Sequence, residues 1–200
     1  MTVHGLEYDC CRSAKSWNYG RWESPNLLLG MATCHSLIKS KETNTIVGHP
    51  VDLAMFKASK AQLEKSKGST ARIKTSSGIL VHVLRRFDFD HNRMTQSVII
   101  QQPDGRKMVI CKGSGESLAK LCLPSDIPSN FFDELQKQAR TGVYSIAVGS
   151  KMLGKDTDVA QLSRDEVESE LVFDGVLNFK NPLRKETPVS RAPLSGKDIV

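Results

Sequence analysis

The chain has 200 residues, of which 39% are hydrophobic and 25% charged, and this composition is typical of one globular domain with a hydrophobic core. Its 28 basic and 22 acidic residues give a formal net charge of +6 that is spread along the chain, so composition allows an anionic partner without indicating nucleic-acid binding. The longest mostly apolar stretch, Leu27 to Ile38, is far shorter than the roughly 20 residues that span a bilayer, and residues 1–5 lack the pattern of a signal peptide, so we expect no direct membrane insertion by this chain.

Two helices are expected in the first third of the chain. Ser24 followed by Pro25 is a good helix start, with serine as the N-cap and proline at the first helical position. The segment NLLLGMATCHSLIKS then repeats apolar residues at helical spacing, which predicts a largely buried helix across it. A second helix should begin near Pro50, so that Asp52 lies in its first turn, where the helix dipole stabilises a carboxylate.

The middle of the chain indicates strands. Residues 65–77, KSKGSTARIKTSS, are polar and basic and are expected to form an exposed loop or edge excursion. ILVHVLRRFDF alternates enough for a strand. QSVIIQQ and RKMVICK flank the turn tripeptide PDG, which predicts a hairpin in which Gly105 can adopt a positive φ.

The last third alternates helices and strands. An amphipathic helix, SNFFDELQKQARTG, should end at Gly142 and lead into the strand VYSIAVGSKM, and a capping box from Ser163 to Glu166 precedes a final strand, LVFDGVLNF. The tail from Lys180 onward, with three prolines and little apolar content, is expected to be poorly ordered. Hairpin-linked strands with helices inserted between other strands predict an α/β fold, an antiparallel twisted β-sheet with helices packed on it.

Five cysteines, at positions 10, 11, 34, 111 and 122, favour reduced thiols in a cytosolic setting, because the count is odd and no secretory signal is evident. A zinc site would need two close ligand pairs, and the sequence has neither C-x-x-C nor H-x-x-x-H spacing. Cys34 and His35 are adjacent on an expected helix and would point in different directions. We therefore expect core thiols and no metal site.

The segment VICKGSGE, residues 109–116, combines a strand end, a lysine and two glycines before a helix start. Glycines let a ligand approach the main chain, and free N–H groups at a helix start attract anions, so the segment could form an anion site. The alternative is a plain strand-to-helix turn in which Gly113 and Gly115 serve only the bend. The motif is neither a Walker loop nor a dinucleotide fingerprint, so both interpretations stay open at this point.

Seven blocks along the chain resemble, in family order, the nucleotide-binding (N) domain of P-type ATPases. The blocks are ATCHSL, VGHPVDLAMF, RRFDF, VICKGSGE, TGVYSIAVGSKML, SRDEVESELVFDGVL and NPLRKET. The resemblance extends from about Thr2 to Thr187 and is closest to the type-five subfamily, whose best-understood members export polyamines from late endosomes and lysosomes. The presence of seven blocks in family order makes the resemblance more specific than any single block.

The resemblance implies an ATP site that includes Asp52, Phe89, Lys112, Gly113, Gly115, Glu116, Arg140 and Tyr144. Phe89 takes the second aromatic place of the family's F-x-F strand, whose ring stacks on adenine, and Asp52 matches the residue that accepts a hydrogen bond from the adenine amino group. KGSGE takes the place of the K-G-x-x-E loop, where Lys112 would supply a positive charge, the glycines close approach and Glu116 the start of the next helix. Because alternate strand residues share a face, the alternative is that Phe87 and Phe89 are both core residues.

The late strand departs from the family pattern. The family usually has an arginine there that reaches the phosphates, and this chain has Tyr144 in its place, with Arg140 as a nearby residue that could substitute. Nucleotide affinity could therefore be weak or its specificity altered. Replacement of Lys112 is expected to weaken ATP binding without unfolding the domain, because a charge at a strand end is not needed for a core.

The resemblance implies the function of one module in a larger pump. We expect residues 1–170 to form the nucleotide-binding domain, and residues 171–200 to form a return segment toward the phosphorylation domain and a disordered tail. The partners would be ATP with Mg²⁺, and the phosphorylation and actuator domains of the same P-type ATPase, at the cytosolic face of an endomembrane. The chain lacks the D-K-T-G-T aspartate, so the full-length pump would be an ATP-hydrolysing translocase while the isolated chain holds no catalytic residue and should not hydrolyse ATP.

Three alternatives remain from the sequence. FDFD could be a D-x-D motif in which Asp88 and Asp90 act as paired carboxylates of a phosphatase or glycosyl transferase. A non-catalytic basic module could bind nucleic acid or acidic lipid through Arg72, Lys74, Arg85 and Arg86, and its binding would weaken steeply with salt, unlike adenine stacking. The chain could also be a degenerate N domain that no longer binds ATP.

Overall fold

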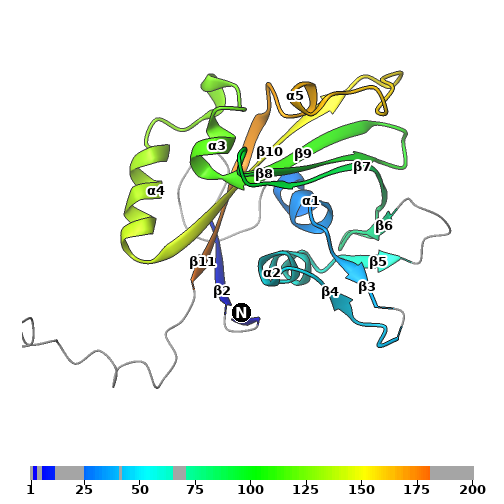
Figure 1. The fold of residues 1–200 in the computed structure, drawn as a ribbon, viewed down its shortest axis with the longest axis horizontal. Coiled ribbons are helices and arrows are strands. Elements are labelled where there is room, and N and C mark those ends of the chain that lie inside the picture. The colour runs from blue at the N-terminus through cyan, green and yellow to red at the C-terminus, as the bar shows by residue number, and fades with distance from the viewer. Residues whose placement is uncertain (1, 4–5, 12–24, 41, 65–70, 181–200) are drawn as a thin grey trace, which may run out of the picture.

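The structure, a computed structural model, describes residues 2–3, 6–11, 25–40, 42–64 and 71–180 of the chain. Within these ranges nine strands form one antiparallel sheet, in the order β1-β2-β11-β10-β9-β8-β7-β6-β5, and a separate hairpin pairs β3 with β4 (Figure 1). The strands of the sheet are β1 (Thr2–Val3), β2 (Leu6–Cys11), β5 (Gln62–Glu64), β6 (Ala71–Lys74), β7 (Leu80–Asp90), β8 (Thr95–Gln101), β9 (Lys107–Ser114), β10 (Val143–Leu153) and β11 (Val172–Lys180). The small hairpin consists of β3 (Ile38–Lys39) and β4 (Ile46–Val47).

Helices cover both faces of this sheet, which confirms the expected fold class. One face packs against α1 (Pro25–Thr33) and α2 (Pro50–Ser59), and the other against α3 (Gly115–Ala119), α4 (Phe131–Arg140) and α5 (Arg164–Val167) (Figure 1). A short 3-10 helix, η1 (Pro124–Asp126), connects α3 to α4. None of the helices in the described part of the chain has the length and apolar content to cross a membrane.

The strands at the middle of the sheet alternate between two hydrophobic cores. Val98 and Ile100 of β8 face the core under α1 and α2, whereas Ile99 between them faces the core under α3 and α4. All three side chains are fully buried. A strand buried on both faces reads as a continuous apolar run, which is why the sequence shows SVII here and not an apolar–polar alternation.

Several local sequence signals are confirmed. The hairpin around PDG is β8 paired with β9, and Gly105 has φ +81°. The second helix begins at Pro50 with Asp52 in its first turn, α4 is followed by Gly142 with φ +74°, and both bonds of the capping box from Ser163 to Glu166 are present. The N-cap expected at Ser24 and the tail after Lys180, including the block NPLRKET, lie outside the described residues.

The first helix is shorter than its apolar spacing predicts. It ends at Thr33, and the ring of His35 then donates from Nε2 to the carbonyl oxygen of Ala32 at 2.8 Å and accepts at Nδ1 from the backbone N–H of Leu37 at 3.2 Å. The prediction that Cys34 and His35 are helical is therefore wrong. A side chain that satisfies backbone groups beyond the helix end offers the chain an alternative to another helical turn, and spacing alone does not reveal it.

The prediction of an exposed loop at residues 65–77 is wrong in part. Ala71–Lys74 form β6, which pairs with β5 and β7, and Ile73 is fully buried while Arg72 and Lys74 are exposed. The basic residues therefore occupy the outward face of an alternating strand. Residues 65–70 of the same segment lie outside the described ranges.

The whole of strand β11 lies after residue 170, where the sequence analysis places the end of the nucleotide-binding domain. It pairs with β10 on one side and with β2 on the other. Residues 172–180 are thus part of the main sheet. The boundary between a nucleotide-binding domain and a return segment stays a prediction.

The cysteines whose side chains the structure describes, Cys34, Cys111 and Cys122, are buried free thiols, in agreement with the sequence analysis. Burial raises the pKa of Cys34 and of Cys122 to about 12, so these thiols stay protonated and unreactive at neutral pH.

The buried ring of His35 predicts a pH-dependent stability. Burial lowers the pKa of His35 from 6.5 to about 4, so the unfolded chain takes up a proton in this range that the folded chain does not. The stability that the neutral ring contributes is present above the unfolded pKa and is lost as the pH falls from 6.5 through 4. We expect the gap in unfolding free energy between wild type and His35→Gln to narrow by about 2 kcal/mol between pH 7 and pH 5 in urea titrations.

The pKa of a second buried group shifts in the opposite direction, but its effect on stability is the same in wild type and in His35→Gln and therefore cancels when the two are compared. Burial raises the pKa of Asp174 to about 6, which strengthens folding as the pH falls, but it does so in both proteins. Parallel pH curves for wild type and His35→Gln would contradict the proposed role of His35.

Candidate functional site

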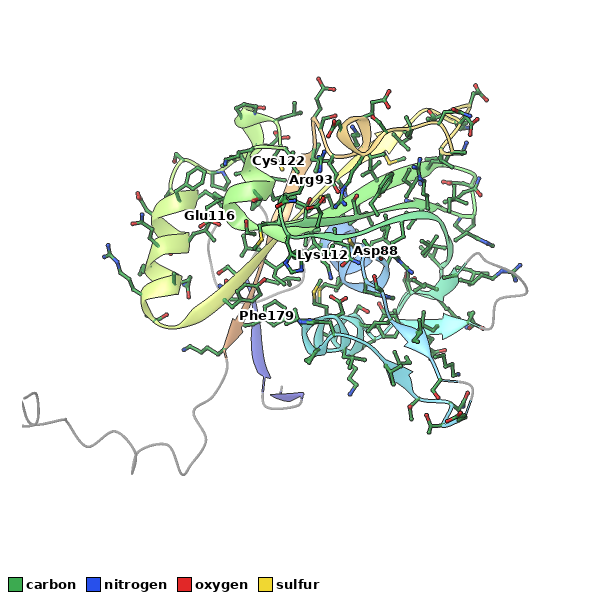
Figure 2. All side chains as sticks on the ribbon, viewed as in Figure 1. Asp88, Arg93, Lys112, Glu116, Cys122 and Phe179 are labelled. Atoms are coloured by element: carbon green, nitrogen blue, oxygen red, sulfur yellow. The ribbon has the colours of Figure 1, made fainter. Side chains whose placement is uncertain are left out.

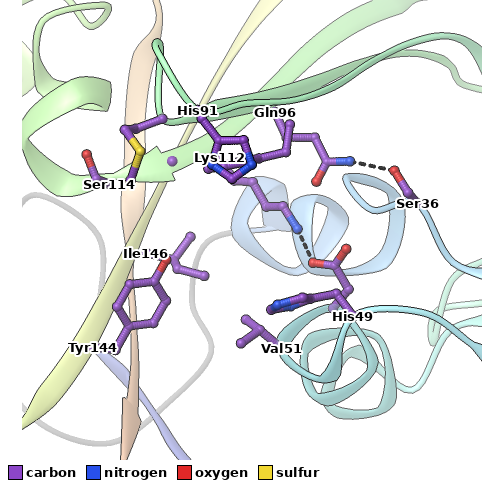
Figure 3. A pocket seen from close by; sticks show the side chains of 13 residues that line it. Ser36, His49, Val51, His91, Gln96, Lys112, Ser114, Tyr144 and Ile146 are labelled. Carbon is purple, nitrogen blue, oxygen red and sulfur yellow. Dashed lines mark hydrogen bonds and ion pairs between the residues drawn. The ribbon is translucent and has the colours of Figure 1, made fainter.

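A pocket of about 430 Å³ opens on the sheet face that carries α2 (Figure 3). Its lining residues come from the loop after α1, the start of α2, the end of β7 with the following turn, and facing positions on β8, β9 and β10. They are Ser36, His49, Val51, Asp52, Phe89, His91, Met94, Gln96, Lys112, Gly113, Ser114, Tyr144 and Ile146. Antiparallel pairing brings the last group together, because Lys112 lies directly opposite Gln96 on β8 and Val148 on β10.

An ion pair between Lys112 and Asp52 forms the deep part of this pocket (Figure 3). The lysine side chain is 8% exposed and the aspartate side chain 11%, so both charges lie in a poorly solvated region. In such a region each charge depends on the other, since removal of one partner leaves the second buried without compensation. Lys112 is therefore fixed by α2 and does not present a free cation to the solvent.

Phe89 reaches the pocket because the strand alternation breaks just before it. The pairing of β7 with β8 shifts register between Phe87 and Asp90. Phe87 packs against the core under α3 and α4, with the Arg85 guanidinium 4.4 Å from its ring centre. Phe89 is 45% exposed, lines the pocket and meets the ring of His91 edge-on with the centroids 5.1 Å apart. Phe87 therefore packs against the core while Phe89 lines the pocket, although regular alternation would put both side chains on one face of the sheet.

Tyr144 stands at the pocket rim, 54% exposed, with its ring tilted against Phe179 at 6.4 Å between centroids. Partial burial, with the negative charge of Asp52 adding to it, raises the pKa of the Tyr144 phenol, so it stays protonated at neutral pH. It offers a hydroxyl group and an aromatic face but no positive charge.

A chain of hydrogen bonds fixes the wall between the first loop and the sheet. Gln96 Nε2 donates to Ser36 Oγ at 2.8 Å (Figure 3). Ser36 Oγ in turn donates to Asp88 Oδ1 at 2.9 Å. Asp90 Oδ1 accepts the backbone N–H groups of Asn92 and Arg93 at 2.8 and 3.2 Å, and these bonds lower the pKa of its carboxyl group. Both carboxylates of FDFD are thus occupied with holding the chain, which gives a D-x-D catalytic pair no support.

Five of the eight residues that the sequence analysis assigned to the site line this pocket: Asp52, Phe89, Lys112, Gly113 and Tyr144. Gly115, Glu116 and Arg140 do not line it. Glu116 is exposed on α3, and Arg140 is exposed at the last residue of α4 (Figure 2 labels Lys112 and Glu116).

The two glycines of KGSGE make room for protein atoms. A Cβ on Gly113 would lie 2.5 Å from the carbonyl oxygen of Met94, and a Cβ on Gly115 would lie 2.3 Å from Leu135 Cδ1 on α4. Ser114 between them caps α3 by accepting from the backbone N–H of Ser117 at 3.2 Å. The segment is therefore a tightly packed strand-to-helix turn, and it contributes Lys112, Gly113 and Ser114 to the pocket lining.

Sequence reasoning missed most of the polar lining. His49 stands next to the block that carries Asp52 and serves as the N-cap residue of α2, and His91 follows Phe89 by two residues. Proximity to recognised motifs could have indicated both histidines. Ser36 and Gln96 carry no local signal, because they meet only when the loop after α1 folds against β8.

The pocket can therefore hold a flat, mostly apolar ligand against an exposed aromatic ring, with a buried carboxylate–ammonium pair beneath it. Its size lies within the roughly 300–1,000 Å³ of small-molecule sites, and its few convergent polar groups are typical of such sites. In the described part of the chain, no group of three or more histidine, cysteine and acidic residues could hold a metal ion.

The family model described as "P-type ATPase, cytoplasmic domain N" matches residues 25–186. The human protein "Probable cation-transporting ATPase 13A4" is 34% identical over 187 residues, which cover 86% of this chain and 16% of that protein. Human "Probable cation-transporting ATPase 13A5" is 33% identical over 96% of this chain and 17% of its own length, and human "Polyamine-transporting ATPase 13A2" is 31% identical over 83% and 16%. The chain thus spans about 16% of the length of the relatives that it matches.

The buried pair leads to a prediction about stability that changes the expectation for Lys112. Because Lys112 is buried and paired, Lys112→Met should lower the unfolding free energy by about 3–5 kcal/mol, through the uncompensated carboxylate of Asp52. The double variant Lys112→Met with Asp52→Asn should lose clearly less than the two single losses added together. Urea unfolding at pH 7 measures all four proteins of this cycle.

A matched control is the exposed pair of Arg106 and Asp104, 2.6 Å apart with side chains 54% and 50% exposed. Arg106→Met should cost less than about 1 kcal/mol. If the losses of unfolding free energy at Lys112 and Asp52 are strictly additive in the double variant, the buried pair contributes no coupling energy. Equal losses for Lys112→Met and Arg106→Met would likewise show that burial does not strengthen the pair.

Proposed function

The chain belongs to the P-type ATPase family as its cytoplasmic N domain, and on that premise we propose that the pocket of Phe89, Lys112 and Asp52 binds the adenine nucleotide of an ATP-driven cation or polyamine pump. The three human relatives reported above are named as cation-transporting or polyamine-transporting ATPases. The pump's activity and its transported substrate are part of this proposal, because the chain spans only a small part of those proteins.

The observation that carries the proposal is the exposed ring of Phe89 above a buried pair of opposite charges. Adenine is flat and aromatic, so it can stack on an exposed phenylalanine ring. Replacement of such a ring by alanine removes the stacking and weakens binding. The edge of adenine bears an amino donor and ring-nitrogen acceptors. Asp52 accepts hydrogen bonds and Lys112 donates up to three, so the pair can meet both kinds of group on that edge.

The charges of the pocket favour recognition of the base over the phosphates. The Lys112 charge is offset by Asp52, Arg140 lies outside the lining, and Tyr144 brings a neutral phenol. His49 and His91 are exposed parts of the lining and can donate hydrogen bonds to a phosphate that leaves the pocket. The triphosphate would thus extend from the pocket toward the solvent.

In the full-length protein, the domain would present the γ-phosphate to an aspartate on a phosphorylation domain that this chain does not contain. Mg²⁺ would arrive with the nucleotide and neutralise charge on its phosphates, and the residues described here would bind and orient the base. The actuator domain of the same pump would be a further partner. We place the domain at the cytosolic face of an endomembrane, and residues beyond β11 would lead back to the phosphorylation domain.

The rival basic module is weakened by the place of its arginines. Arg85 donates to the carbonyl oxygens of Val159 and Leu162 at 2.9 and 2.6 Å and stacks on Phe87, so it is committed to packing. Arg72 and Lys74 are exposed on β6 at the far side of the sheet from β10. Arg85 is therefore not available to an exposed basic surface together with Arg72 and Lys74.

The experiment that tests the proposal compares Phe89→Ala with Phe87→Ala. Phe89→Ala should weaken ADP binding by about 1–3 kcal/mol through lost stacking, with little change in melting temperature because the ring is 45% exposed. Phe87→Ala should lower the melting temperature and leave affinity nearly unchanged, because its ring packs in the core on the opposite face. Calorimetry or backbone NMR titration measures the affinity, and thermal unfolding the stability.

The reverse pattern would contradict nucleotide binding at this pocket. If wild type binds neither ADP nor ATP, the chain is a degenerate N domain. If it binds and Phe89→Ala binds equally well, the nucleotide lies elsewhere.

Because the charges of the pocket compensate one another, nucleotide affinity should depend only weakly on the number of phosphates and on the salt concentration. Adenosine, AMP, ADP and ATP should bind within about tenfold of one another, because the single lysine of the lining is already paired. Affinity for ADP should change far less between 50 and 200 mM salt than the ~1,000-fold or greater loss of proteins that bind many phosphates. A steep salt dependence would favour the basic module.

A further inference from the structure

A buried carboxylate lies on the sheet face opposite the pocket. Glu168, the residue after α5, has a side chain with 0% exposure. Its oxygens accept from Thr95 Oγ1 at 2.9 Å, Ser97 Oγ at 2.7 Å and Arg164 Nε at 2.9 Å. Three charge-assisted bonds compensate the burial of this anion and join the segment after α5 to the first residues of β8.

The guanidinium of Arg164 continues from this carboxylate to the backbone that flanks the pocket. Its Nη1 donates to the carbonyl oxygen of Asp88 at 3.0 Å, and its Nη2 donates to that of Thr95 at 2.9 Å. These two carbonyls bracket residues 89–94, the segment that supplies Phe89, His91 and Met94 to the pocket. One planar fork therefore fixes both ends of this segment.

The segment between these anchors needs such support. Met94 has φ +56°, a left-handed conformation that is uncommon for a residue with a side chain. Its carbonyl oxygen accepts from the backbone N–H of Ser114 at 3.1 Å, and this approach is possible because Gly113 has no Cβ. Arg93 adds a contact of 2.5 Å from Nη2 to Asp165 on α5 (Figure 2 labels Arg93 and Asp88).

We propose that Arg164 and Glu168 are positioning residues for the pocket, which hold residues 89–94 from the opposite face of the sheet in the conformation that presents Phe89, His91 and Met94 to the ligand. The proposal rests on the proposed nucleotide function for the identity of its ligand. The positioning itself rests on the contacts of the ligand-free chain.

A second arginine beside the first provides a matched control. Arg85 and Arg164 lie 4.4 and 6.0 Å from the centre of the Phe87 ring. Arg85 donates to the carbonyl oxygens of Val159, Ala160 and Leu162, and so holds the loop before α5. Both guanidiniums thus make backbone bonds on the same face, but only those of Arg164 reach the ends of residues 89–94.

The test uses Arg164→Lys and Arg85→Lys, which keep the charge and remove the fork. In the ligand-free proteins, hydrogen exchange at the amide groups of Met94 and Ser114 should be faster by about tenfold in Arg164→Lys and nearly unchanged in Arg85→Lys. The amide group of Gly105, in the distant hairpin turn, serves as the internal reference. ADP affinity should fall by about 2- to 30-fold in Arg164→Lys, the range for residues that act on a site through others, and by less than about twofold in Arg85→Lys.

The outcomes separate the two proposals. Equal exchange at Met94 and Ser114 in both variants, or faster exchange with unchanged ADP affinity, would overturn the positioning role and leave Arg164 as a contributor to stability alone. If wild type fails to bind ADP, the nucleotide function falls, and the exchange comparison still decides whether Arg164 holds residues 89–94. Glu168→Gln should reproduce the faster exchange of Arg164→Lys, because the neutral amide orients the guanidinium less strongly.

Discussion

The ion pair of Lys112 and Asp52 is the contact on which the arrangement of the site depends. It joins the first turn of α2 to the end of β9 across 60 positions of sequence, in a region where neither charge is well solvated. A buried charge without its partner is costly, so the helix layer and the sheet are held in the one relative position that satisfies both. That position brings His49 and Val51 of the α2 start opposite Tyr144 and Ile146 of β10, and the space between them is the pocket.

The start of β8 shows how a strand buried on both faces can carry polar residues. Thr95, Gln96 and Ser97 are all buried, and each has a partner: Thr95 and Ser97 donate to Glu168 on one face, while Gln96 donates to Ser36 on the other. The strand then continues as the apolar run of the two cores. Polar side chains therefore gather where the sheet meets the pocket, and their satisfied hydrogen bonds make that end of the sheet specific in structure.

Local signals in the sequence predicted the elements well, and contacts between distant segments account for what they missed. The PDG hairpin, the start of α2 at Pro50 and the capping box at Ser163 depend on neighbouring residues, so a short window of sequence contains their cause. The end of α1 depends on the His35 ring and the place of Phe89 depends on a register shift, and neither has a local signature. Likewise, Lys112 could be assigned to the pocket from its motif, but its pairing with Asp52 is visible only in three dimensions.

The distribution of charge in the pocket suits recognition of the nucleotide base and leaves the reaction at the γ-phosphate to groups outside the pocket. The groups that can distinguish one base from another lie deep, because the side chains of Lys112 and Asp52 are 8% and 11% exposed. The neutral side chains of Phe89 and Tyr144 lie closer to the solvent, at 45% and 54% exposure. A pocket of this kind, on the proposed assignment, gains little free energy from the phosphates, so it binds nucleotide before and after loss of the γ-phosphate with similar strength. Interactions that differ between ATP and ADP must then come from parts of the pump outside the described residues, where the phosphates and their Mg²⁺ would meet the acceptor aspartate. The domain would thus hold the nucleotide by its base throughout the cycle, and the direction of the cycle would be set at the other end of the nucleotide.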